Sequence, residues 1–282
     1  MIDRRIGAGF GDAYFGPAPF SDDGHELEVD DRFERSELDS RLWIPHYLPH
    51  WSSRAASAAR FDVGGGRLRL RIDVDQPPWC PEFDGWVRVS SLQTGVYAGS
   101  LGAAIGQHRF TPELVVREEQ TRAALYTPTY GLFEARARAI ADPANMVALW
   151  MIGFEEEPER SAEICIFEIF GRDVGRRQVR VGMGLHPFGD PTITDDFAHP
   201  TVRIDARDAH DYAALWTPEG VAFYVDRQLI MVTAQSPNYP MQFMLSVYEF
   251  ADGPEPPSPA ERYPKIFEVE RFRGYRPRSA PP

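Results

Sequence analysis

The sequence has little cysteine and no long apolar run. Only Cys80 and Cys165 occur among 282 residues, which excludes a disulfide-stabilised scaffold, and neither lies in a zinc-ligand pair. No stretch reaches the roughly 18 apolar residues of a membrane-spanning helix. The first twenty residues lack the apolar core of a signal peptide, which leaves a cytoplasmic protein and a trimmed secreted protein as open alternatives.

Positive charge is also scarce. Thirty Lys and Arg residues against 42 Asp and Glu residues give a net charge of −12. An acidic chain is repelled by phosphate backbones and by anionic lipid surfaces, so neither nucleic acid nor a membrane is an expected partner. The sequence offers no handle on oligomeric state.

Alternating apolar and polar residues predict strands through most of the chain. Residues 67–72 alternate strictly after three glycines, and residues 222–232 read as a hairpin with its turn at Asp226 and Arg227. Further expected strands span residues 132–138, 179–185, 243–247 and 267–275. Many short strands separated by Gly and Pro turns favour an all-β sandwich or barrel.

The chain is expected to form one domain. Residues 1–27 are rich in Gly, Pro and Asp and are predicted to be a loosely ordered arm, residues 28–276 the β domain, and residues 277–282 a tail. Glu155, Glu156 and Glu157 are interpreted as a solvated loop. His46 and His50 lie four residues apart, but Pro45 and Pro49 disfavour the helix that would bring them together as metal ligands.

The segment 162–171 combines a strand-like pattern with two carboxyl groups. Ile164, Ile166 and Ile169 supply an apolar face, and the alternation of a strand places Glu163 on the opposite face. Glu168 would then point into the core, where an unpaired carboxylate is costly. A β-bulge near Phe167 would correct the phase and place Glu163, Cys165 and Glu168 on one face.

Two carboxyl groups a few ångströms apart are what retaining glycoside hydrolysis requires. One attacks the anomeric carbon while the other protonates the leaving oxygen. The alternative from the pattern alone is a pair of surface glutamates on an edge strand.

The ordered motifs of the chain resemble glycoside hydrolase family 16, the laminarinase-like glycanases. Residues 163–168 match the family pattern E-x-D-x-x-E except at its middle acid, and residues 130–136 resemble Y-G-x-F-E-A-R. Residues 148–153, 210–218 and 223–229 resemble further family strands in the family's order. The resemblance implies a concanavalin A-like jelly roll, a two-sheet antiparallel sandwich with a concave substrate groove.

The resemblance also implies roles for individual residues. Glu163 resembles the nucleophile, Glu168 the acid/base, and Cys165 stands where the family has an orienting Asp. Trp150 resembles a tryptophan on which a sugar ring stacks, with a core tryptophan as the alternative, and His186 resembles a histidine near the scissile bond. The expected substrate-binding residues are Trp150, His186, Tyr130, Trp79 and Trp86.

The chain departs from the family pattern at several places, among them Met146 and Val147, which replace a family Trp-Pro pair at one wall of the groove. A hydrogen bond to a charged group contributes about 1.5–3 kcal/mol, so Cys165 in place of Asp is expected to slow turnover about ten- to hundredfold without abolishing it. Arg32 replaces a Glu near the family's structural calcium site, so no cofactor is required, although the resemblance allows calcium. Residues 76–110, with Trp79 and Trp86, form a long insertion that borders the groove or packs as a surface loop.

We therefore expect a retaining endo-glycosidase acting on a polysaccharide or oligosaccharide, with a β-1,3- or mixed-linkage glucan as the expected substrate. A transglycosylase is a close variant. The rival hypothesis is a carbohydrate-binding protein on the same fold that has lost turnover, with Cys165 as the mark of that loss.

Overall fold

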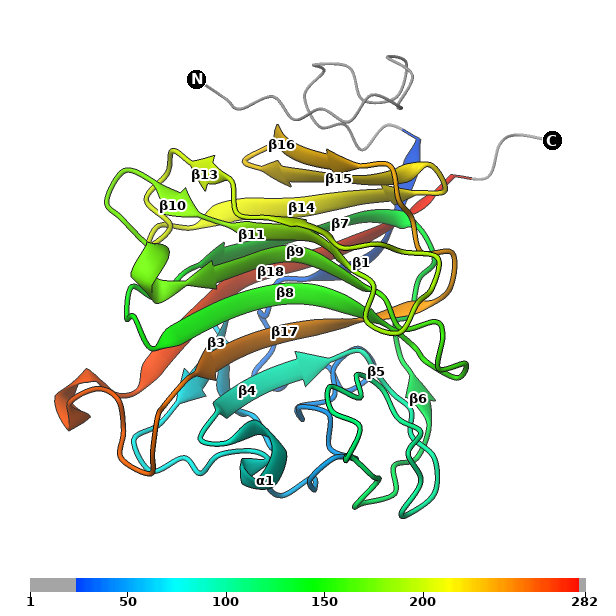
Figure 1. Ribbon diagram of the computed structural model, residues 1–282. Coiled ribbons are helices and arrows are strands. Elements are labelled where there is room, and N and C mark those ends of the chain that lie inside the picture. Colours follow the sequence, from blue (N-terminus) through cyan, green and yellow to red (C-terminus); the bar gives the residue numbers. More distant parts are fainter. Residues whose placement is uncertain (1–23, 279–282) are drawn as a thin grey trace.

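Two antiparallel sheets form most of the protein, for which a computed structural model describes residues 24–278 (Figure 1). The larger sheet has eight strands in the order β16-β15-β14-β7-β18-β3-β2, with β1 also paired to β18. Its strands are β1 (His25–Asp31), β2 (Arg60–Gly64), β3 (Arg67–Ile72), β7 (Gly131–Arg138), β14 (His210–Thr217), β15 (Gly220–Val225), β16 (Gln228–Thr233) and β18 (Lys265–Pro277).

The smaller sheet has six strands in the order β12-β11-β9-β8-β17-β4. Its strands are β4 (Arg88–Gln93), β8 (Asn145–Gly153), β9 (Glu163–Phe170), β11 (Gly182–His186), β12 (Asp196–Ala198) and β17 (Met241–Glu249). The remaining elements are β5 (Gly95–Val96) paired with β6 (Ala123–Ala124), β10 (Val179–Arg180) paired with β13 (Thr201–Val202), the short helix α1 (Pro81–Asp84), and 3-10 turns at Gly171–Asp173 and Ala260–Arg262.

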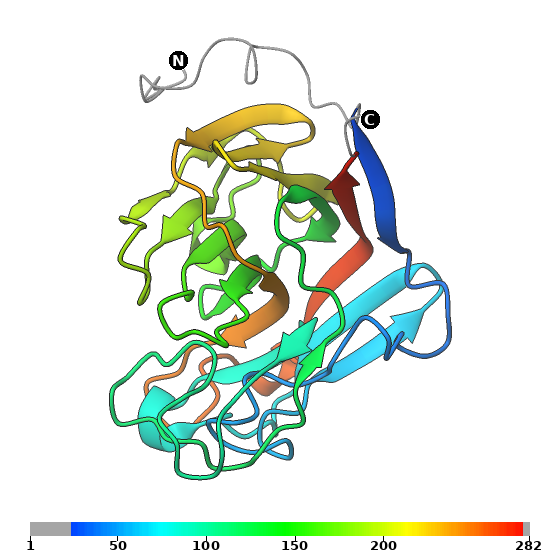
Figure 2. The ribbon, with the colours of Figure 1, turned by 90° about the vertical axis from the view of Figure 1, so that its right-hand side faces the viewer.

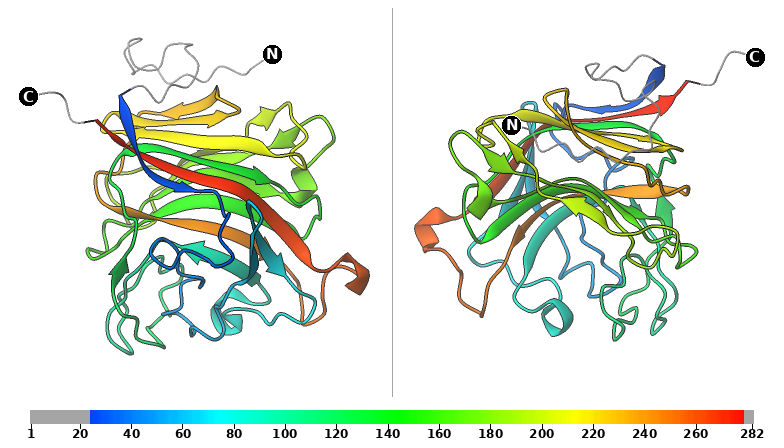
Figure 3. Two further views of the ribbon diagram at one scale, coloured as in Figure 1. Left: turned by 180° about the vertical axis from the view of Figure 1, so that it is seen from behind. Right: turned by 45° about the horizontal axis from the view of Figure 1, so that its top comes forward.

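The core lies between the two sheets, which face each other as two layers (Figure 2). Seen from behind, β18 and β1 of the eight-stranded sheet face the viewer, with β8 and β17 beyond them (Figure 3). The alternation of β3 shows how the sequence builds this layer. Leu68, Leu70 and Ile72 are fully buried in the core, and the arginines between them point outward. The predicted two-sheet antiparallel jelly roll is confirmed.

Most predicted strands have the expected bounds. The hairpin turn between β15 and β16 holds both Asp226 and Arg227 at positive φ, as a two-residue turn requires. The stretch expected as one strand over residues 179–185 is divided at Val181, because β10 pairs with β13 whereas β11 pairs with β9 and β12.

The expected chain boundaries agree only in part with the strands. Residues 1–23 of the predicted arm and residues 279–282 of the predicted tail lie outside the described residues. The end of the predicted arm is not loose, since β1 already begins at His25 and pairs with the end of β18. No helix among residues 24–278 is long and apolar enough to cross a membrane.

The face of the six-stranded sheet that points away from the core, called the site face below, carries a second apolar cluster. Trp79, Cys80 and Trp51 pack there against Trp150, Cys165 and other residues of the sheet. The predicted insertion 76–110 is therefore not one loop: it contains α1, β4 and β5, and β4 forms the edge of the sheet (Figure 1).

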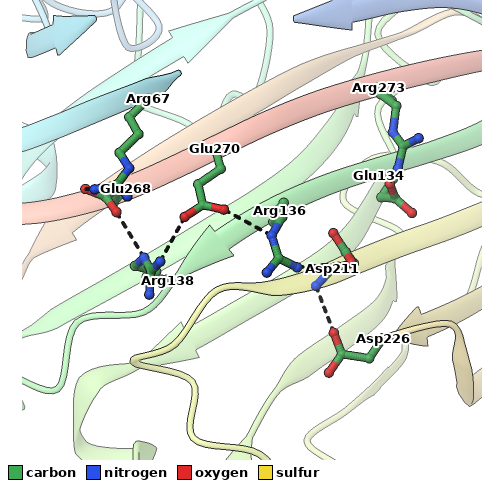
Figure 4. A network of polar contacts seen from close by, with 9 residues as sticks. All are labelled: Arg67, Glu134, Arg136, Arg138, Asp211, Asp226, Glu268, Glu270 and Arg273. Carbon is green, nitrogen blue, oxygen red and sulfur yellow. Dashed lines mark hydrogen bonds and ion pairs between the residues drawn. The ribbon is translucent and has the colours of Figure 1, made fainter. Parts of the chain in front are cut away.

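The outer face of the eight-stranded sheet is built differently, from ion pairs (Figure 4). Arg138 on β7 contacts Glu268 at 3.0 Å and Glu270 at 2.8 Å, both on β18. Arg136 joins Glu270 at 3.0 Å to Asp211 on β14 at 3.2 Å. These cross-strand pairs form a continuous network over the strands in the middle of the sheet.

Candidate active site

A β-bulge in β9 brings the predicted residues to one face. Leu149 of β8 pairs with Phe167, but the next residue, Trp150, pairs with Cys165, so Ile166 has no partner across the sheet. Ile166 and Phe167 both point into the core, and the alternation on either side of them is restored. The predicted bulge near Phe167 is present, one residue before it.

The bulge places both carboxyl groups beside one sulfur atom. The Sγ atom of Cys165 lies 4.0 Å from Oε2 of Glu163 and 3.7 Å from Oε1 of Glu168. A thiol has one proton and is a weak donor, so it can donate to only one carboxylate at a time, and weakly. Burial raises the pKa of the Cys165 thiol, and the neighbouring carboxylates raise it further, so the thiol stays protonated.

The two carboxyl groups differ in electrostatic environment. Burial raises the pKa of Glu168, the charge of Glu163 raises it further, and the opposing effect of His186 and His108 does not reverse the shift. A raised pKa keeps a carboxyl group protonated at higher pH, which is the requirement for a general acid. Glu163 is also buried, and its Oε1 atom lies 3.2 Å from Nδ1 of His108.

Two of the predicted substrate-binding residues lie beside this pair. Trp150 of β8 pairs directly with Cys165 but is only 5% exposed, so its ring packs mostly against protein. His186 of β11 pairs with Glu163 across the strands and remains partly exposed. Its Nδ1 atom lies 2.6 Å from Asp195, and its ring stacks on Phe197 at 4.4 Å.

The other three predicted residues do not join the pair. Tyr130 precedes β7 in the other sheet and packs edge-on against Trp216 at 5.2 Å. Trp79 is 1% exposed and its indole N–H donates to Asp84 at 2.6 Å, so it offers no face to a sugar. Trp86 is 39% exposed, and no contact connects it to Glu163 or Glu168 within residues 24–278.

Sequence reasoning missed His108, which contacts Glu163, and two residues that contact His108 in turn, Glu155 and Phe188. The ring of His108 stacks on Phe188 at 4.5 Å and meets Trp150 edge-on at 5.1 Å. Glu155, interpreted above as part of a solvated loop, is 5% exposed and accepts a hydrogen bond from the backbone N–H of His108 at 2.7 Å. Burial raises the pKa of Glu155 well above its ordinary value.

The side chains near Arg32 do not fit a calcium ion. Both oxygens of Asp30 accept hydrogen bonds from Arg271 at 2.6 Å, and Asp31 accepts one from the indole of Trp43 at 2.9 Å. Within the described part of the chain, no group of three or more His, Cys, Asp or Glu residues is arranged to hold a metal ion. No step proposed below uses a metal.

The arrangement defines a class of protein: a jelly roll whose outward sheet face holds two neighbouring glutamates, one with a raised pKa, as a two-carboxylate glycosidase requires. Comparison with known proteins agrees. The profile described as glycosyl hydrolases family 16 matches residues 120–258. None of the curated proteins matches the chain significantly.

Solved structures share the fold. A GlcNAcα1-4Gal-releasing endo-β-galactosidase from Clostridium perfringens is 27% identical with a TM-score of 0.77, over 92% of this chain and 65% of that one, so this chain spans less than two thirds of that enzyme. The laminarinase of Flavobacterium sp. UMI-01 is 18% identical (TM-score 0.60, 89% of this chain and 100% of that one). The laminarinase of Rhodothermus marinus is 20% identical (TM-score 0.61, 90% and 98%).

The segment 120–258, which carries both glutamates, belongs to glycoside hydrolase family 16.

Proposed function

We propose that the protein is a retaining endo-glycosidase in which Glu163 is the nucleophile and Glu168 the acid/base. The observation that carries the proposal is the bulged strand β9, which brings both carboxyl groups within 4.0 Å of the Cys165 sulfur on the site face. A second observation distinguishes the two roles, since burial and the neighbouring charge raise the pKa of Glu168.

The reaction would take place in two steps. First, a carboxylate oxygen of Glu163 forms a bond to the anomeric carbon, the glycosidic bond breaks, and Glu168 gives its proton to the leaving oxygen. The ionised Glu168 then takes a proton from water, whose oxygen attacks the same carbon and releases Glu163. A sugar hydroxyl in place of water would give transglycosylation by the same path.

We propose the β-galactoside class as the first substrate class. The likeness to the clostridial endo-β-galactosidase has higher identity and a higher TM-score than those to the two laminarinases. The β-1,3- or mixed-linkage glucan expected from the sequence is the second class. Those laminarinases are less than 25% identical, so they speak for the shared fold and not for a shared substrate.

The competing function is glycan binding without turnover. The observation that favours it is Cys165, whose sulfur is a weaker hydrogen-bond partner than the family's carboxyl group. The retention of both glutamates on one face, with the acid's pKa raised, favours catalysis instead.

The test is the release of reducing sugar from a panel of glycans. The panel holds laminarin, mixed-linkage β-glucan, β-1,4-galactan and a β-galactoside oligosaccharide capped by GlcNAcα1-4Gal. Wild type is compared with Glu163→Ala and Cys165→Asp, and thermal melting confirms that each variant is folded. Product from wild type that Glu163→Ala abolishes supports the proposal. Silence from both wild type and Cys165→Asp on every glycan, with binding retained, would establish the non-catalytic function.

A further inference from the structure

The family pattern has an acid between the two glutamates, and this chain has a thiol there. The nucleophile therefore lacks the strong neighbour on its own strand that would orient it. The structure shows a different polar group at that carboxylate: Nδ1 of His108 lies 3.2 Å from Oε1 of Glu163. This nitrogen is buried and has no hydrogen-bond partner of good geometry, so its contact with Glu163 is the nearest ionic one available to it.

The imidazole of His108 is held in a fixed orientation by its neighbours. One face stacks on Phe188, with the rings inclined by only 17°, and Trp150 meets it edge-on. Because aromatic contacts on two sides restrict rotation of the ring, Nδ1 stays within contact distance of Oε1 of Glu163, at 3.2 Å. The side chain of His108 is 15% exposed.

The backbone that carries the ring is anchored as well. Gln107, which is fully buried, donates from its side chain to Gln242 of β17 at 2.6 Å, and its backbone oxygen accepts from the indole of Trp51 at 2.8 Å. The N–H of His108 itself donates to Glu155 at 2.7 Å. Two strands of the six-stranded sheet thus determine where His108 lies. β17 does so through Gln242, and β8 does so through Glu155 in the residues that follow it.

Backbone conformation gives an independent sign. His108, Glu155 and Phe188 all have positive φ angles, 53°, 55° and 48°, a region that non-glycine residues rarely adopt. Such strained residues persist only where the surroundings fix them, and they gather at functional sites. Here the three come from three different loops and meet beside one carboxylate.

We propose that His108 is a positioning residue for Glu163. In the family pattern the middle acid of the catalytic strand lies beside the nucleophile; here His108, from the segment before β6, supplies the polar contact instead. This inference rests on the proposed function, because it gives Glu163 the role of nucleophile. The imidazole contacts the Glu163 carboxyl group and holds it in place for attack, while Glu155 accepts the hydrogen bond that fixes the backbone of His108.

The test separates the imidazole from the backbone that carries it. In His108→Gly the positive φ is relieved and the imidazole is lost, whereas His108→Asn tolerates the same φ and keeps a donor near the position of Nδ1. The control is His210→Ala, which removes a histidine of similar exposure that pairs with Asp226 at 2.7 Å on the other sheet. Each variant is assayed on the panel glycan that the wild type cleaves fastest.

We expect His108→Gly to lower kcat about ten- to hundredfold with little change in KM, since the contact acts on the attacking oxygen and not on sugar binding. His108→Asn should recover at least part of this loss, and His210→Ala should match wild type. Adding Cys165→Asp should help His108→Gly more than it helps wild type, because the introduced carboxyl group and the imidazole of His108 serve the same carboxylate.

Three results distinguish the possible failures. A kcat of His108→Gly within about twofold of wild type would overturn the positioning role alone, provided that Glu163→Ala is inactive. Strictly additive effects of the substitutions at positions 108 and 165 on kcat would also overturn the positioning role. If the glycine variant does not fold, the same double-mutant cycle can be measured with His108→Asn. No product from wild type on any glycan would contradict the proposed function itself.

Discussion

Carboxylates meet opposite partners on the two outward faces of this sandwich. On the eight-stranded sheet, arginines surround them: burial alone would raise the pKa of Glu270, but hydrogen bonds from Arg138 and Arg136 outweigh it and lower the pKa (Figure 4). On the site face no arginine of residues 24–278 forms an ion pair with Glu163 or Glu168, and the pKa of Glu168 is raised. The same residue type therefore has a lowered pKa on one face and a raised pKa on the other.

The partner, and not burial alone, therefore decides the direction in which the pKa of a half-buried glutamate shifts in this fold. An arginine fork keeps a carboxylate ionised and fixed in place. A second carboxylate and a protonated thiol leave the site-face glutamates free to exchange protons. Substitution of the partner or of the carboxylate should therefore have different consequences on the two faces.

The largest expected effect is the loss of the acid on the site face. Glu168→Gln cannot protonate the leaving oxygen, so we expect kcat/KM to fall about 10²- to 10⁴-fold. The matched control is Glu270→Gln, a half-buried strand glutamate on the other sheet. Steady-state rates on the cleaved glycan are the measurement, and equal losses in both variants would remove the distinction between the faces.

The second effect is a gain. Cys165→Asp restores the acid of the family pattern between the glutamates, and we expect kcat to rise about tenfold, the lower end of what a hydrogen bond to a charged group contributes. Reducing-sugar assays at several pH values measure it. A rate that falls in Cys165→Asp would show that the site has become adapted to the thiol.

The two faces should also respond to pH in opposite directions. A carboxyl group whose pKa is raised by folding binds more protons in the folded state, so Glu168 and Glu155 make stability fall as pH rises from the ordinary glutamate value of about 4.3 through their folded pKa. Glu270, with a lowered pKa, contributes stability above the unfolded pKa that is lost as pH falls through its folded pKa.

Thermal melting across pH checks this. Glu168→Gln should flatten the decline on the alkaline side, and Glu270→Gln should flatten the decline on the acid side. Identical profiles for the two variants would contradict the opposite pKa shifts on which the comparison rests.

The smallest expected effect is the removal of one arginine from the outer network. Arg138 is 32% exposed, and partly solvated pairs contribute about 0.2–1 kcal/mol each, so Arg138→Met should lower the free energy of unfolding by about 1 kcal/mol. Urea unfolding measures the loss, and activity should not change. A drop in kcat would mean that the faces are coupled through the core.

The fold and the bulged strand that carries Glu163 and Glu168 could be predicted because their signals are local in sequence. The alternation of residues 67–72 fixes which side of β3 is buried, and the spacing of Glu163 and Glu168 requires a bulge once both must avoid the core. The order of the family-like motifs along the chain predicted the remaining strands of the sandwich.

The surroundings of Glu163 could not be predicted, because they come from distant loops. His108 lies 55 positions before Glu163 in the sequence. Its position beside Glu163 depends on the hydrogen bond from Gln107 to Gln242 and on the positive φ angle of His108, and no sequence pattern predicts either feature. Glu155 lies in a run of glutamates that is typical of an exposed loop. Its burial depends on the hydrogen bond that it accepts from the backbone N–H of His108. Tyr130 and Trp79 lie away from the two glutamates because an aromatic residue in a motif packs as readily against other aromatic rings and into a core as into a groove.

The central claim is that Glu163 forms a bond to sugar. It is tested most directly by incubating the protein with an activated 2-deoxy-2-fluoro derivative of the released oligosaccharide, which slows hydrolysis of a glycosyl-enzyme, and measuring the intact mass. The account predicts the added mass of one 2-fluoro oligosaccharide, on the peptide that contains Glu163, and no added mass in Glu163→Ala. A wild-type protein that cleaves the glycan yet gains no mass, or an adduct that persists in Glu163→Ala, would contradict it.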